Sequence, residues 1–128
     1  MSAIEINHIN IRASADLITV LRDFYCDALQ LQVGKRPPFT SQGYWLYAGD
    51  RALIHLSICR KDEQRQPHVV NTLDHIAFTC TDQTAMRARL TELDIKFTHD
   101  SVPGASIQQL FFYDPAGNGV ELSFIDDA

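Results

Sequence analysis

The chain has 128 residues, 45% of them hydrophobic and 21% charged, which is typical of one globular domain and argues against extensive disorder. Its net charge of −5 disfavours a nucleic-acid partner, because such partners require a basic face. No apolar run approaches the roughly 20 residues that cross a bilayer, and the first residues lack a basic region followed by an apolar segment. We therefore expect a cytoplasmic protein with a small-molecule substrate, and neither a nucleic acid nor a membrane as partner.

The first part of the chain predicts a strand followed by a helix. Isoleucines alternate with His8 over residues 6–11, so His8 is expected on the polar face of a strand. Ser14 or Asp16 can cap the helix that follows, which should end near residues 29–31. The apolar stripe expected on this helix consists of Leu17, Val20, Leu21, Phe24 and Ala28.

Three short strands are expected to complete this half. Residues 31–35 predict a strand that ends before Pro37, because proline cannot donate a ladder hydrogen bond. Residues 43–48 and 52–58 then predict a hairpin, with His55 on the polar face of its second strand. The segment 60–67 is charged and without period, and indicates a solvated linker.

The second half predicts the same order of elements. The expected elements are a strand over 72–80 that carries His75, a helix capped by Asp82, and strands over 95–98, 107–112 and 120–125, the last after a turn at 114–119. Each half is thus a strand, a helix and three strands.

Two pairs of polar side chains occupy matched positions in the two halves. His55 lies 47 residues after His8, and Glu121 lies 46 residues after His75. Each half therefore offers one ligand-type side chain on its first strand and one on its last. We take these four residues as the candidate functional set, although any one histidine alone could be a surface residue of a strand.

The duplicated order predicts a single domain built from two modules. Module one spans 1–59, a linker spans 60–71, and module two spans 72–128. Because several strand pairings must be non-local, the expected class is α+β with a curved, mostly antiparallel sheet.

Three short features add a family resemblance that covers nearly the whole chain. They are Phe24-Tyr25 late in the first helix, the turn Asp114-Pro115-x-Gly117-Asn118, and the Glu121-Leu122 that follows it. Together with the repeat, they resemble the vicinal oxygen chelate superfamily, which includes glyoxalase I, methylmalonyl-CoA epimerase, fosfomycin resistance enzymes and extradiol dioxygenases. The resemblance implies two tandem βαβββ modules that form a curved mixed, mostly antiparallel sheet around a metal-binding cleft.

The resemblance also implies that His8, His55, His75 and Glu121 bind a divalent metal ion. Three imidazoles and one carboxylate suit Zn, Ni, Fe, Co or Mn better than the hard cations Ca and Mg. In a lyase or isomerase of glyoxalase I-like type, Glu121 would move a proton between adjacent carbons of a substrate bound through two oxygens. His55 would then be a ligand or a second base.

Substrate contacts are expected on the same strand faces. Arg12, four residues after His8, resembles the arginine that holds the glutathione carboxylate in glyoxalase I, or it is a solvated strand end. The residues expected to line the cleft are Trp45, Tyr47, Gln109 and Phe111. Their aromatic rings favour a partly apolar or aromatic substrate, although Trp45 and Tyr47 suit a core or a dimer interface equally well.

Two other activities remain open. His8, His75 and Glu121 would make the iron triad of an extradiol-type ring-cleaving dioxygenase, with Tyr113 and His55 as acid–base groups. A metal-free drug-binding protein, like the bleomycin resistance proteins, would use the same fold without chemistry. The resemblance further implies a homodimer, in which the four metal ligands meet within one chain or across two.

Overall fold

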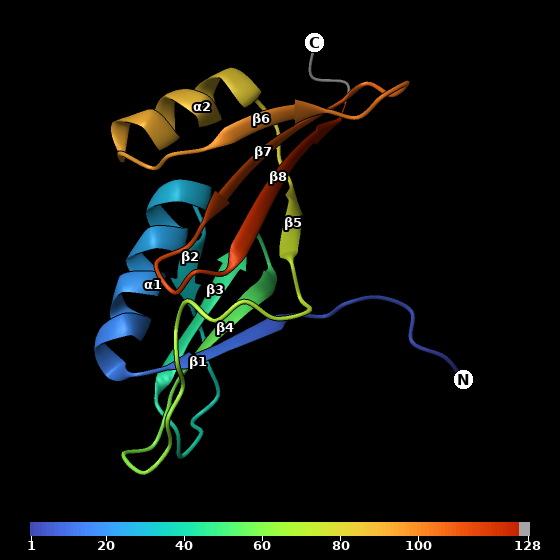
Figure 1. The fold of residues 1–128 in the computed structure, drawn as a ribbon. Coiled ribbons are helices and arrows are strands. Elements are labelled where there is room, and N and C mark those ends of the chain that lie inside the picture. The colour runs from blue at the N-terminus through green and yellow to red at the C-terminus, as the bar shows by residue number, and fades with distance from the viewer. Residues whose placement is uncertain (126–128) are drawn as a thin grey trace. The chain divides into compact units, whose positions relative to one another are not determined.

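The computed structural model describes residues 1–125 and divides the chain into two compact units (Figure 1). Unit 1 spans Met1–Pro67, and unit 2 begins at His68. The last three residues of the predicted module two, 126–128, lie outside the described residues. Within residues 1–125, neither helix has the length and apolar character needed to cross a membrane.

Unit 1 is a mixed four-stranded sheet with one helix (Figure 1). Its elements are β1 (Ile9–Ala13), α1 (Ala15–Leu29), β2 (Gln32–Gly34), β3 (Gly43–Ala48) and β4 (Arg51–Ile58). The strand order is β1-β4-β3-β2, in which β1 runs parallel to β4 and the other neighbours are antiparallel. The helix provides the crossover that a parallel pair requires.

Helix α1 begins where the sequence predicts but buries a different stripe. The hydroxyl of Ser14 accepts a hydrogen bond from the Leu17 backbone N–H at 3.3 Å, which confirms this residue as the N-cap. The buried side chains are Ile18, Leu21, Tyr25 and Ala28. The predicted stripe was wrong in part, since Val20 is 50% exposed. Both stripes are apolar, and packing against the sheet selected the one that contains Ile18 and Tyr25.

Unit 2 has the same order of elements. They are β5 (His75–Thr79), α2 (Gln83–Glu92), β6 (Thr98–Ser101), β7 (Ile107–Tyr113) and β8 (Gly119–Ile125). The strand order is β5-β8-β7-β6, again with a parallel first pair and antiparallel neighbours. The predicted α+β class, with two tandem βαβββ modules and mixed, mostly antiparallel pairing, is confirmed.

The parallel pairs of the two units match in register. Asn10 lies opposite His55 in unit 1, and Ala77 lies opposite Glu121 in unit 2. In each unit a histidine stands two residues before the first of these positions, at His8 and at His75. The two histidines and their partners are therefore equivalent in three dimensions within their own units, as the duplication predicts.

Several predicted boundaries differ from those observed. The strand predicted over 72–80 begins only at His75. His8 immediately precedes β1 rather than lying within it. The strand predicted over 95–98 begins only at Thr98, because the chain first completes the end of α2. There Asp94 adopts a left-handed conformation with φ 58°, and the Ile95 N–H bonds to the Leu90 carbonyl at 2.9 Å. The N–H of the first residue of the predicted strand is thus used by the helix end.

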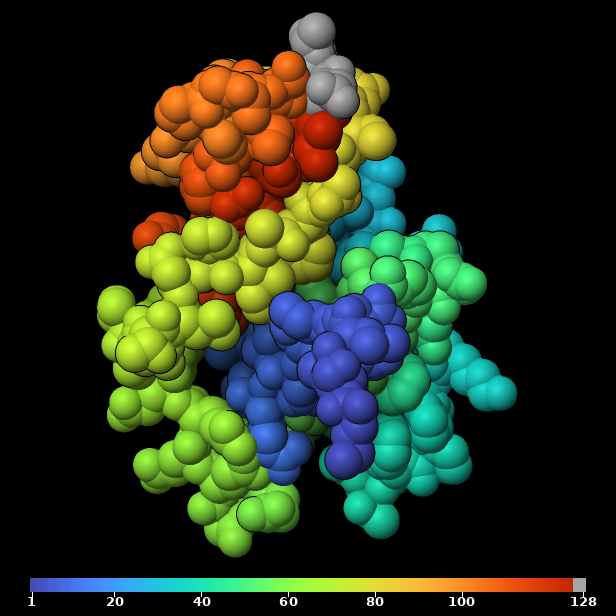
Figure 2. Space-filling view, turned by 90° about the vertical axis from the view of Figure 1, so that its right-hand side faces the viewer, coloured from blue at the N-terminus to red at the C-terminus, as the bar shows by residue number. Residues whose placement is uncertain are grey.

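The segment 60–67, predicted as a linker, is a surface segment of unit 1. The space-filling view shows this yellow-green segment and the dark blue N-terminal residues at the surface of the protein (Figure 2). All residues of 60–67 are exposed except Glu63, whose side chain is only 14% exposed. One acidic residue of an otherwise solvated segment therefore turns inward.

Candidate metal and substrate site

In unit 2, the candidate site is a histidine held between two carboxylates. His75 Nε2 lies 3.1 Å from Glu121 Oε1, and His75 Nδ1 lies 2.7 Å from Asp74 Oδ2. The hydrogen bond to Asp74 raises the pKa of His75, and the negative charge of Glu121 raises it further. Glu121 is buried, and its second oxygen accepts a hydrogen bond from Gln109 Nε2 at 3.2 Å.

In unit 1, the candidate site is a stack of three aromatic rings. The His55 ring lies between His8, at 3.7 Å between centroids, and Trp45, at 3.9 Å, with both pairs nearly parallel. His55 is 8% exposed. Burial lowers the pKa of His55, and nearby His8 and Arg36 lower it further. His55 is therefore neutral at physiological pH, the form in which imidazole binds a cation or accepts a proton.

Asn7 and Asp74 are two residues that the sequence analysis missed. Asn7 Oδ1 lies 2.8 Å from His8 Nδ1, and Asp74 Oδ2 stands in the same relation to His75 Nδ1. Metal-binding histidines commonly donate one ring N–H to such an oxygen, which fixes the ring and leaves the other nitrogen for the ion. The sequence does contain a sign of these contacts, because a residue with a side-chain oxygen directly precedes each of the two matched histidines.

The donor types fit a borderline divalent cation, with two donors in each unit. Within the described residues 1–125, no group of three or more histidine, cysteine, aspartate or glutamate side chains surrounds one point. An imidazole nitrogen binds a cation in the plane of its ring. Because the His8 and His55 rings are stacked, a cation in the plane of one ring would lie out of the plane of the other. His8, which is exposed, must therefore turn away from His55 for both imidazoles to bind one ion.

The turn before β8 sets the position of Glu121. Asp114 is 3% exposed, and its carboxylate accepts hydrogen bonds from the backbone N–H groups of Ala116 and Asn118 and from Asn118 Nδ2, each at 2.9 Å. A Cβ added at Gly119 would lie 2.2 Å from the Asp74 carbonyl oxygen, so only glycine allows this close approach. The turn therefore fixes the register that faces Glu121 toward His75.

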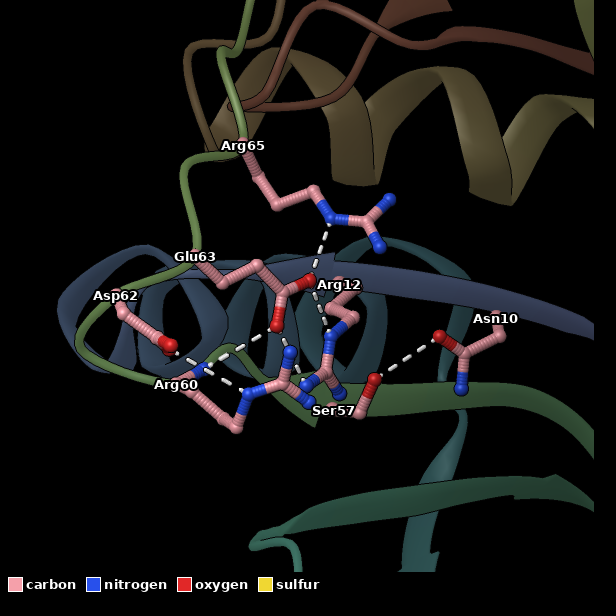
Figure 3. Close-up of polar contacts among 7 residues, drawn as sticks. All are labelled: Asn10, Arg12, Ser57, Arg60, Asp62, Glu63 and Arg65. Carbon is pink, nitrogen blue, oxygen red and sulfur yellow. Dashed lines mark hydrogen bonds and ion pairs between the residues drawn. The ribbon is translucent and has the colours of Figure 1, made fainter.

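A cavity of about 680 Å³ lies beside the ring stack in unit 1. Its lining includes Arg12, Arg36, Phe39, Trp45, His55 and Glu63. The Arg12 guanidinium forms a two-pronged ion pair with Glu63, in which Nε and Nη2 each lie 2.7 Å from a carboxylate oxygen (Figure 3). Glu63 thus bonds to the guanidinium of Arg12, for which the resemblance suggested either a substrate carboxylate or solvent as the partner.

The remaining predicted substrate residues have different surroundings. Phe111 lines a cavity of about 380 Å³ in unit 2, together with Tyr113, the candidate acid–base group of a dioxygenase. The Phe111 ring meets His75 edge-on at 5.8 Å between centroids. Tyr47 instead packs its ring over Gly34 and donates its hydroxyl to the Lys35 carbonyl. Gln109 donates a hydrogen bond to Glu121, as described above.

Two βαβββ units, one with paired imidazoles and one with an imidazole facing a carboxylate, define a protein of the glyoxalase-fold class. The family model for the Glyoxalase/Bleomycin resistance protein/Dioxygenase superfamily matches residues 5–122. The chain belongs to this superfamily, which confirms the resemblance seen in the sequence.

Relatives of the chain agree with this assignment. It is 28% identical over 127 residues to Glyoxylase I 4 of Arabidopsis thaliana, a match that covers 94% of this chain and 71% of the relative. Among solved structures, the glyoxylase/bleomycin resistance protein/dioxygenase domain from Frankia sp. EAN1pec superposes with a TM-score of 0.73 at 19% identity, covering 96% of this chain and 93% of that one. Lactoylglutathione lyase from Agrobacterium tumefaciens gives a TM-score of 0.64 at 18% identity, covering 97% and 96%. At these identities, the two structures show the fold.

Proposed function

We propose that the protein is a divalent-metal-dependent enzyme of glyoxalase I-like type, a lyase or isomerase acting on a small molecule. One observation carries the proposal: the ring of His75 is held by Asp74 on one nitrogen and faces buried Glu121 with the other. His8 makes the equivalent contact to Asn7 Oδ1 in unit 1. The likeness to Glyoxylase I 4 and the fold shared with lactoylglutathione lyase support the reaction type.

In this proposal, His8, His55, His75 and Glu121 hold the cation and the protein moves the proton. A divalent cation held there would polarise two substrate oxygens and acidify a neighbouring C–H. Glu121 takes the proton from one carbon and returns it to the adjacent carbon, while Gln109 orients its carboxylate. Neutral His55 serves as a ligand or as a second base.

A second candidate is an extradiol-type ring-cleaving dioxygenase. The observation that favours it is the position of His55, which is buried between the rings of His8 and Trp45. If His55 keeps that position, His8, His75 and Glu121 form the two-histidine, one-carboxylate set of non-haem iron oxygenases. Tyr113 and His55 would then exchange protons with the substrate.

Metal content of purified protein tests the proposal. Protein prepared without chelator and supplied with Zn, Ni, Fe, Co or Mn is expected to retain one equivalent, and the variants His75→Ala and Glu121→Ala are expected to lose it. His99→Ala is the matched control, because His99 also lies in unit 2 but its Nε2 contacts Gln108. Absence of bound metal, or equal loss in the control, would overturn the assignment. Oxygen uptake with catechol by the iron-loaded protein would favour the dioxygenase over the lyase or isomerase.

We also propose that the protein is a cytoplasmic homodimer. Light scattering after gel filtration tests the dimer, and mixing two inactive variants tests whether one site uses two chains. A refolded mixture of His8→Ala and His75→Ala chains regains metal binding only if unit 1 of one chain meets unit 2 of the other, because some sites then contain neither substitution. If the mixture does not regain metal binding, all four ligands come from one chain.

A further inference from the structure

We infer that the substrate carries an anionic group, bound by the guanidinium of Arg36, and a planar part that packs against Trp45 in the cavity of unit 1. This inference deepens the proposed function and rests on it, since it names the substrate class of the same site. The arginine involved differs from Arg12, for which the family resemblance offered either carboxylate binding or a solvated strand end.

The first argument is the charge of the cavity. Four arginines line it, Arg12, Arg36, Arg60 and Arg65, and among the described lining residues Glu63 is the single acid. The chain as a whole carries a net charge of −5. The positive potential of this protein is therefore concentrated in the cavity, which attracts anions, while the acidic remainder of the surface repels them.

The second argument is that three of these arginines are already paired with carboxylates (Figure 3). Arg12 and Arg65 both bond to Glu63, the latter through Nε at 2.7 Å, and Arg60 Nε lies 3.4 Å from Asp62 Oδ1. The hydrogen bonds from Arg12 and Arg65 hold the pKa of Glu63 well below its ordinary value of 4.5. Glu63 therefore stays charged at neutral pH and continues to occupy both partners.

Arg36 differs from the other three. Its Nη1 donates to the Ser41 carbonyl at 2.9 Å and its Nη2 to the Ser41 hydroxyl at 3.3 Å, which are neutral acceptors. Among the side chains that the structure describes, Arg36 Nε is the buried nitrogen left without a hydrogen-bond partner. No carboxylate of residues 1–125 forms an ion pair with Arg36. Because Arg36 has no carboxylate partner, its planar guanidinium suits a planar oxyanion.

The aromatic side chains around Arg36 indicate the rest of the ligand. The Arg36 guanidinium carbon lies 4.9 Å from the centre of the Phe39 ring, and Phe39 lies 6.2 Å from Trp45. Trp45, which stacks on His55, lines the same cavity. Flat rings beside a cation favour a conjugated or aromatic carboxylate, whose ring can pack against the indole.

Trp45 is the single tryptophan of the chain, so its fluorescence reports directly on this cavity. Full-length protein is titrated with benzoate and with benzamide, its neutral isostere, with excitation at the red edge of the indole band. We expect benzoate to quench Trp45 saturably and to bind about tenfold or more tightly than benzamide. Arg36→Met is expected to weaken benzoate binding roughly 10- to 100-fold and to leave benzamide binding unchanged.

Arg65→Met is the matched control, because it removes the same charge from the same cavity but from an arginine already bonded to Glu63. Benzoate affinity in this variant is expected to stay close to that of the parent. If Arg36→Met disturbs folding, Arg36→Lys keeps the charge without the planar donors and should give an intermediate affinity.

The inference is overturned if benzamide binds as tightly as benzoate, if both methionine variants lose benzoate equally, or if Arg36→Met weakens both probes alike. Because binding is measured without turnover, this result is separate from metal content. If the protein binds no metal but still prefers benzoate to benzamide, the proposed enzyme is wrong and the anion site is retained.

Discussion

Replacing Asp114 by alanine should destabilise the protein strongly, because one buried carboxylate holds the turn that leads into β8. Its oxygens accept three hydrogen bonds at 2.9 Å from Ala116 and Asn118. A hydrogen bond to a charged group contributes roughly 1.5–3 kcal/mol, and three that share one acceptor do not add fully. We therefore expect Asp114→Ala to lower the free energy of unfolding by about 3–4 kcal/mol.

The size of this effect is large enough to measure in two ways. For a chain of this length, about 1 kcal/mol corresponds to roughly 4 °C in Tm, so the expected fall is about 12–16 °C by calorimetry or circular dichroism. Urea unfolding should show a lower midpoint with an unchanged slope. Asp114→Asn keeps the shape and one acceptor oxygen, and should lose only about 1–2 kcal/mol. A loss of less than about 1 kcal/mol in the alanine variant would refute the role given to this turn.

Three further predictions concern other positions. Gln109→Ala removes the hydrogen bond to Glu121 Oε2 and should weaken metal binding roughly 10- to 100-fold in competition with a chromophoric chelator, whereas unchanged affinity would contradict a positioning role. Gly43→Ala places a Cβ 1.9 Å from the Leu56 carbonyl oxygen, so β3 and β4 must separate and urea unfolding should show a loss of at least about 2 kcal/mol. The pKa of Glu63 is lower in the folded state than its ordinary value of 4.5. The charged carboxylate therefore stabilises the fold at pH values above 4.5, and this stabilisation is lost as the pH falls below 4.5. The difference in unfolding free energy between the parent and Glu63→Gln should therefore be largest at neutral pH and shrink in acid, and a difference independent of pH would contradict the ion pair.

The sequence by itself determined the order of elements and their duplication. The alternation around His8 and His75 and the turns before β4 and β8 are local patterns, and the backbone responds to local patterns within a few residues. The nearly equal spacings placed His55 and Glu121 at equivalent positions of the two halves, and the registers of the two parallel strand pairs agree with that placement. The same local chemistry offered Ser14 or Asp16 as the helix cap, and the structure uses Ser14.

Only the tertiary structure decided which groups meet across long sequence separations. Arg12 and Glu63 are 51 residues apart, and nothing local distinguishes Glu63 from the other charged residues of its segment. The stack of Trp45 on His55 and the choice of buried stripe on α1 likewise depend on side-chain packing, in which each partner is selected by shape and by competition among alternatives of similar polarity. Periodicity specifies which face of an element is apolar, whereas the partner of a particular side chain is fixed only when the whole unit has packed.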